Sequence, residues 1–204
     1  GFTKMNNKEI ESRQMLPAKN YQSEIKTGSQ AFTEDLNAKE CFVWRTIYRK
    51  DFLKQNNIKF INGIYFEDIP FTTECYLKAK KCIITNQLIY IYRQREGSIL
   101  TSMNKQKVLD FHQVLNVLWK MKKDMSLTES EYKKLKEVIF ITFSVETWYI
   151  SHNKELLSAR REIMADLNKK VPDLHFTGGF KEGVISFLYR NMPNTYIKLR
   201  SLFY

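Results

Sequence analysis

The chain has 204 residues, of which 43% are hydrophobic and 14% aromatic, enough to bury the core of one domain or two small ones, so a disordered chain is excluded. Seven glycines, four prolines and the absence of any internal repeat exclude a repeat array or a linker-rich chain. The formal net charge of +11 predicts attraction to anionic partners, although lysines spread along the sequence equally fit an ordinary solvated surface.

The first half of the chain is predicted to mix helices with short strands. Amphipathic helices are expected at residues 30–37 and 44–55, and a third at residues 69–80. Two strands rich in isoleucine and tyrosine follow at residues 82–85 and 87–93, joined by a tight polar turn at Asn86.

Two adjacent acidic residues, Glu67 and Asp68, stand at the start of the third helix. They follow an aromatic, turn-containing stretch with Phe60, Gly63, Tyr65 and Phe66. A carboxylate at a helix N-terminus faces the positive end of the helix dipole and stays ionised near neutral pH, as a general base must. The alternative is that Asp68 only caps the helix.

Further anchors surround this pair in a fixed order: Trp44, Tyr48, Arg49 and Leu53; then Phe60, Gly63, Glu67, Asp68 and Phe71; then Tyr92, Arg93, Arg95, Gly97 and Ser98. In this order and at these separations they resemble the second half of family 2 glycosyltransferases. The resemblance covers about residues 31–101 and fades after Met103.

The resemblance implies a GT-A-type enzyme that transfers a sugar from a nucleotide-sugar donor to an acceptor hydroxyl, on a glycan or a lipid-linked acceptor, with inversion at the anomeric carbon. Asp68 matches the aspartate that removes the proton from the attacking hydroxyl, and Glu67 would be its supporting acid. Trp44 matches an aromatic residue near the acceptor, where an indole can stack on a sugar ring. A tryptophan that packs in the core is the alternative.

The region after the second strand closes over the donor or acceptor site in this family. Arg93, Arg95 and Ser98 are therefore candidate substrate contacts, since a guanidinium can clamp a phosphate or carboxylate through paired hydrogen bonds. The alternative is a loop held by local ion pairs, such as one between Arg95 and Glu96.

One departure from the family pattern concerns the donor half. These enzymes hold a divalent metal, Mg or Mn, through an Asp-x-Asp motif, and neither that motif nor a glycine-rich phosphate loop occurs here. The chain opens with Gly1 and without an initiator methionine. It is therefore expected to be part of a longer enzyme whose metal ligands lie mostly elsewhere, and to be inactive alone.

The second half of the chain is predicted to be helical. An apolar stripe marks residues 104–124, and Thr128 with Glu131 forms a capping-box pattern that begins the next helix. Further helices are expected at residues 154–167, 181–190 and 195–203. The predicted fold class is thus α/β or α+β, with an acceptor-side half over residues 1–103 and a helical bundle over residues 104–204.

Cysteine and histidine suggest no separate chemistry. Cys41, Cys75 and Cys82 fit free thiols in a reducing compartment, with no disulfide or zinc pattern, and the three histidines are widely spaced. With no secretion signal and no apolar run of transmembrane length, the sequence predicts a cytoplasmic protein.

The end of the chain, from Phe187 to Phe203, mixes aromatic, aliphatic and basic residues. This pattern is typical of peripheral contact with a membrane on its cytoplasmic face, or of a helix that packs on the bundle. Two other functions compete with the glycosyltransferase hypothesis. One is a non-catalytic basic module that binds nucleic acid or an anionic partner, against which no nucleic-acid motif is found. The other is a scaffold for oligomerisation.

Overall fold

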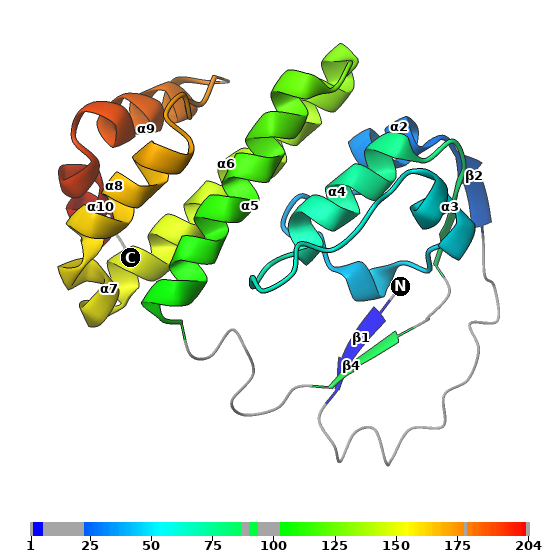
Figure 1. Ribbon diagram of the computed structural model, residues 1–204, viewed down its shortest axis with the longest axis horizontal. Coiled ribbons are helices and arrows are strands. Elements are labelled where there is room, and N and C mark those ends of the chain that lie inside the picture. Colours follow the sequence, from blue (N-terminus) through cyan, green and yellow to red (C-terminus); the bar gives the residue numbers. More distant parts are fainter. Residues whose placement is uncertain (1, 6–22, 87–89, 94–102, 178, 203–204) are drawn as a thin grey trace.

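The computed structural model describes residues 2–5, 23–86, 90–93, 103–177 and 179–202. It shows an α+β fold whose N-terminal portion mixes short helices with strands and whose C-terminal region is helical, as predicted (Figure 1). The N-terminal elements are β1 (Phe2–Met5), β2 (Ser23–Lys26), α2 (Gly28–Gln30), the π-helical turn η1 (Ala31–Asp35), the 3-10 turn η2 (Val43–Arg45), α3 (Lys50–Gln55), α4 (Asp68–Lys78), β3 (Cys82–Thr85) and β4 (Tyr90–Arg93). The C-terminal elements are α5 (Lys105–Asp124), α6 (Glu129–His152), α7 (Lys154–Ser158), α8 (Arg160–Lys170), α9 (Phe180–Asn191) and α10 (Pro193–Arg200).

The strands form two separate pairs. β1 runs parallel to β4, with Met5 opposite Arg93, and β2 runs antiparallel to β3, with Ile25 opposite Ile83. Both predicted strands are present, but the expected hairpin is wrong, because within the described residues β3 and β4 each pair with a strand near the N-terminus. Strand pairing depends on distant partners, which the local pattern of a single strand does not reveal.

A glycine lets the first short helix approach α4. The backbone N–H of Gly28 donates to the Ala79 carbonyl at 2.9 Å. A Cβ atom at this position would lie 2.2 Å from the Tyr76 carbonyl oxygen, far inside van der Waals contact. The helix predicted at residues 30–37 is therefore present as α2 and the π-helical turn η1, docked against α4.

The single helix predicted over residues 44–55 is wrong. The chain forms η2, then a non-helical stretch over residues 46–49 with extended backbone at Thr46 and Arg49, then α3. Extended backbone here lets the Tyr48 ring contact Phe71 edge-on at 5.2 Å, beside a small cluster formed by Ile58, Phe71 and Cys75. Packing of one aromatic ring thus overrides the helical periodicity of the segment.

The C-terminal helices follow their sequence signals closely. The Asn104 side chain accepts a hydrogen bond from the Lys107 N–H at the start of α5, and the capping box of Thr128 and Glu131 begins α6, as predicted. The helix expected at residues 154–167 is instead divided at Ala159 into α7 and α8. The last two predicted helices are confirmed as α9 and α10.

One main core joins the two portions of the chain. Phe32 and Cys41 from the N-terminal portion pack with residues of α5, α6 and α8, including Leu115, Phe143 and Ile163. All three cysteines are free thiols, in agreement with the sequence. Among the described residues, no helix combines the length and apolar character needed to cross a bilayer.

Candidate active site

The acidic pair is delivered by a turn with an unusual backbone. Gly63 has φ of 79°, which suits a glycine, but Phe66 also lies in the left-handed region with φ of 65°. A bulky residue is rarely found there, and such strain costs on the order of 1–3 kcal/mol and clusters at functional sites. The strained residue Phe66 lies directly before the predicted acidic pair, Glu67 and Asp68.

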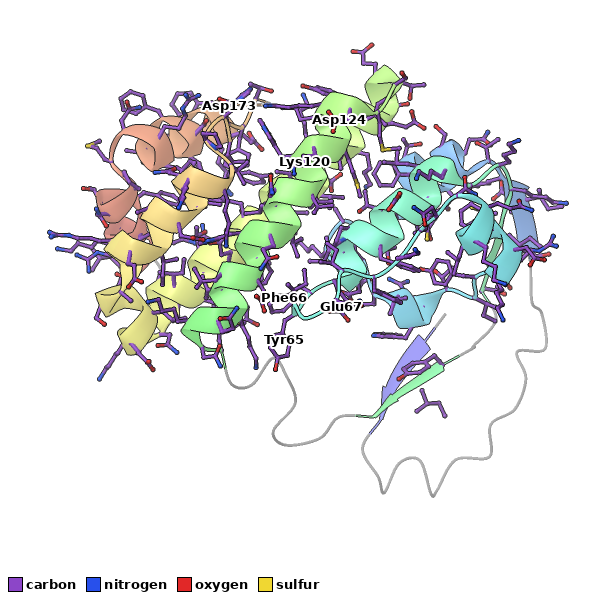
Figure 2. All side chains as sticks on the ribbon, viewed as in Figure 1. Tyr65, Phe66, Glu67, Lys120, Asp124 and Asp173 are labelled. Atoms are coloured by element: carbon purple, nitrogen blue, oxygen red, sulfur yellow. The ribbon has the colours of Figure 1, made fainter. Side chains whose placement is uncertain are left out.

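Helix α5 holds this turn from behind. The Phe66 ring stacks on Phe111 with centroids 3.9 Å apart, and the Tyr65 N–H donates to the Asp110 carboxylate at 3.1 Å. Asp110 is buried, and its other oxygen accepts from the Gln106 amide at 2.9 Å. Figure 2 shows Tyr65, Phe66 and Glu67 together at the turn beside α5. These contacts fix a strained turn and so fix the direction of the acidic residues after it.

Glu67 occupies the N-cap position of α4, and Asp68 is the first helical residue. The N-cap is therefore Glu67 and not Asp68, and the Glu67 side chain makes no capping hydrogen bond. Both side chains are partly buried. The pair lies at the helix start, as the sequence predicts, with Asp68 inside the first turn.

Burial raises the pKa of the Asp68 carboxyl, and the nearby Glu67 charge raises it further, to about 6. Hydrogen bonds from the backbone N–H groups of Asp68 and Ile69 act in the opposite direction but are weaker. The effect of the helix terminus on the Asp68 pKa is thus smaller than the effect of burial. At pH 7 the group is still mostly ionised, with a basicity well matched to proton abstraction near neutral pH.

Trp44 lies in η2 and is half-buried among aromatic rings. Its indole stacks with Phe42 at a centroid distance of 5.1 Å and with Tyr90 of β4 at 4.9 Å. These contacts connect η2 to the sheet formed by β1 and β4. They also occupy indole surface that the family resemblance would offer to a sugar.

The remaining predicted contacts lie at and beyond the end of β4. Arg93 is the last residue of that strand and pairs with Met5 of β1. Arg95 and Ser98 lie outside the described residues. Trp44 and Arg93 are thereby connected to the same small sheet through Tyr90 and β4.

Metal binding was expected to involve residues mostly outside this chain. In the part of the chain that the structure describes, no three His, Cys, Asp or Glu side chains gather as metal ligands. Glu67 and Asp68 alone do not make such a site.

A second polar cluster was not found from the sequence. His112 is fully buried between two carboxylates, with Nδ1 at 2.6 Å from Asp166 and Nε2 at 2.7 Å from Glu146. Burial lowers the pKa of the imidazole, but the two carboxylates outweigh it and raise the pKa overall. The partners lie 54 and 34 residues along the chain, so no local pattern could reveal them. The cluster joins α5, α6 and α8.

Parts of this sequence are similar to parts of known proteins. An uncharacterized glycosyltransferase of Escherichia coli, YibD, is 40% identical over 57 residues, covering 28% of this chain and 17% of that protein. The uncharacterized glycosyltransferase EpsJ of Bacillus subtilis is 32% identical over 72 residues, covering 35% of this chain and 21% of that protein. The cholesterol galactosyltransferase of Borreliella burgdorferi is 27% identical over 178 residues, covering 78% and 48%.

The chain is similar to glycosyltransferases. It spans less than half the length of each of these relatives. No protein-family model matches it, and no solved structure is significantly similar to it. The names of these relatives agree with the resemblance found in the sequence.

Proposed function

We propose that this chain is the acceptor-side portion of an inverting, family 2-like glycosyltransferase of GT-A type. The observation that carries the proposal is the strained, clamped turn that places Glu67 and Asp68 at the start of α4, with the pKa of Asp68 at about 6. A capping carboxylate requires neither a left-handed Phe66 nor a raised pKa. A general base benefits from both, because it needs a fixed direction and a basicity near the working pH.

In the proposed reaction, the ionised Asp68 carboxylate accepts the proton of an acceptor hydroxyl. The hydroxyl oxygen attacks the anomeric carbon of the donor sugar, and the nucleoside diphosphate leaves from the opposite face. Glu67 supports the site by holding the acceptor or by raising the basicity of its neighbour, an effect consistent with its influence on the Asp68 pKa.

The donor, with its divalent metal, is proposed to bind mainly to residues outside this chain. Arg93, Arg95 and Ser98 are proposed to contact substrate near the end of β4, and Trp44 to border the acceptor. The isolated chain is accordingly proposed to be inactive and to bind a nucleotide diphosphate with manganese only weakly. Titration calorimetry that finds tight, metal-dependent binding to this chain alone would contradict that division.

The catalytic role is tested in the longer parent protein with Asp68→Asn. Turnover should fall by about two to four orders of magnitude, because the proton acceptor is lost. Donor affinity, measured separately by calorimetry, should be retained, since Asp68 faces the acceptor. Transfer at near the original rate by a folded Asp68→Asn enzyme would show that Asp68 is not the base.

A further inference from the structure

Helix α9 presents an apolar face to solvent. The side chains of Phe180, Phe187 and Val184 are 90%, 60% and 40% exposed. At 3.6 residues per turn, these three positions fall within an arc of about 60° on one side of the helix. A surface helix ordinarily directs its polar side outward, so this arrangement is reversed. Figure 1 shows α9 at the outer edge of the helical region, at the end of the molecule opposite β2.

The opposite face of α9 is firmly anchored. Tyr189 is only 1% exposed, and its hydroxyl donates to the Asn168 side chain of α8 at 2.7 Å. The Ser186 hydroxyl accepts from the Phe176 N–H at 3.1 Å, and the Tyr189 ring packs edge-on against Phe143 of α6. Rotating α9 to bury its apolar stripe would break these contacts. The stripe, defined as Phe180, Val184 and Phe187, is thus exposed because of how the helix is held.

Cationic side chains flank the stripe on both sides. From Phe180, Lys181 lies about 100° around the helix in one direction and Arg190 about 80° in the other. The one acid of α9, Glu182, accepts a hydrogen bond from the Gly179 N–H at 2.9 Å. From residue 179 to the end of the chain, Glu182 is the single acid, against four cationic residues: Lys181, Arg190, Lys198 and Arg200.

A shallow, widely open depression adjoins the stripe where Arg190 lies. It has a volume of about 520 Å³ between α9 and residues 175–177, and Phe187, Arg190 and His175 line it. Arg190 makes no ion pair within the described part of the chain. The nearby Asp173 carboxylate interacts with Arg190 electrostatically, but its ion pair is with Lys123 at 2.9 Å, which leaves the guanidinium to meet an anionic group. An exposed apolar ring beside an available guanidinium matches the boundary between acyl chains and phosphates in a bilayer.

We propose that α9 is a peripheral membrane-binding surface, which inserts the stripe into an anionic bilayer while Lys181 and Arg190 meet lipid phosphates. A second copy of the chain fits this surface less well, because two copies would bring together cations on chains that each carry a net charge of +11. The sequence places membrane contact in the stretch from Phe187 onward. The structure buries Tyr189, Tyr196 and Ile197 of that stretch. Phe203 lies outside the described residues.

Sedimentation with lipid vesicles tests the proposal on this chain. The wild type should bind vesicles that contain both phosphatidylglycerol and phosphatidylcholine. It should bind vesicles of phosphatidylcholine alone much more weakly. Phe180→Ala with Phe187→Ala should weaken binding about a hundredfold, since each lost phenyl ring accounts for roughly tenfold. Lys181→Gln with Arg190→Gln should weaken it at least about tenfold.

A matched control removes two exposed apolar side chains elsewhere. Ile25 and Ile83 are each 64% exposed and pair across β2 and β3, so replacing both by alanine should leave vesicle binding unchanged. Circular dichroism and melting confirm that every variant is folded. Failure of the wild type to bind anionic vesicles, or full binding by the folded double-Phe variant, overturns the proposal. So does a dimer without lipid, seen by analytical ultracentrifugation, that the double-Phe substitution dissociates.

Discussion

Replacing Asp68 by asparagine should stabilise this chain at neutral pH and have little effect in acid. The pKa of Asp68 in the folded protein is about 6, against an ordinary value of 3.8, because the carboxyl is partly buried beside Glu67. Asparagine keeps an oxygen that can accept the hydrogen bonds from the N–H groups of Asp68 and Ile69. It removes the charge that burial and Glu67 disfavour.

The magnitude follows from linkage between protonation and folding. A folded-state pKa above the unfolded value means that the folded state binds the proton more tightly. Stability is therefore lost as the pH rises from about 4 to about 6, and the loss then stays constant. The two pKa values correspond to about 3 kcal/mol at most. Asp68 retains some contact with solvent, so a gain of roughly 1–3 kcal/mol is expected for Asp68→Asn at pH 7.5.

Urea unfolding at pH 4 and pH 7.5 measures the effect, with free energies of unfolding obtained by linear extrapolation. The two proteins should be nearly equally stable at pH 4 and diverge at pH 7.5, in favour of the variant. Asp51→Asn is a matched control, because Asp51 is an exposed carboxylate in the first turn of α3. It should change stability by less than about 1 kcal/mol at both pH values.

The opposite sign would refute this reasoning. If the wild type gains stability over Asp68→Asn as the pH rises, the helix terminus holds the carboxylate in its ionised form, and Asp68 acts as a stabilising end-of-helix charge. A difference that does not change with pH would mean that burial and Glu67 do not govern its protonation. Either result would also remove the main support for Asp68 as a base with a tuned pKa.

Other consequences can be measured independently. The rate of sugar transfer by the longer parent protein should fall about tenfold per pH unit below about pH 6, as Asp68 becomes protonated. A rate that stays constant below pH 6 would contradict the role of Asp68 as the base. His112→Gln should destabilise the chain by about 3–5 kcal/mol in urea at pH 6, because Glu146 is left buried without its partner. The pKa of His112 is raised, so the stability that its protonation contributes is complete below about pH 6.5 and is lost as the pH rises through the raised pKa. The difference in free energy of unfolding between the wild type and His112→Gln should therefore become smaller at high pH. Gly28→Ala should lower the free energy of unfolding by at least about 2 kcal/mol. Gly183→Ala, where an added Cβ meets open space, should leave the free energy of unfolding unchanged or raise it slightly. Burial raises the pKa of all three thiols, to about 12 for Cys41 and Cys75. Cys82 is the most exposed of the three, so mass spectrometry should find iodoacetamide on it first; early labelling of Cys41 would contradict the buried core.

The sequence by itself determined the features that depend on neighbouring residues. The helical periodicity of apolar residues over residues 104–124 locates α5, and the capping box of Thr128 and Glu131 locates α6. Both signals are local, because helical hydrogen bonds and caps join residues three or four apart. The position of Glu67 and Asp68 at a helix start was likewise readable from order and spacing. So was the resemblance to glycosyltransferases, which the similarity to relatives of that name supports.

Tertiary structure alone decided the rest, because the deciding contacts join residues far apart in the chain. The pairing of β3 with β2 and of β4 with β1 depends on partners that local periodicity does not specify. The enclosure of His112 by Glu146 and Asp166 depends on the packing of three helices. The raised pKa of Asp68 has the same origin, since burial, which depends on the surrounding fold, outweighs the local backbone hydrogen bonds.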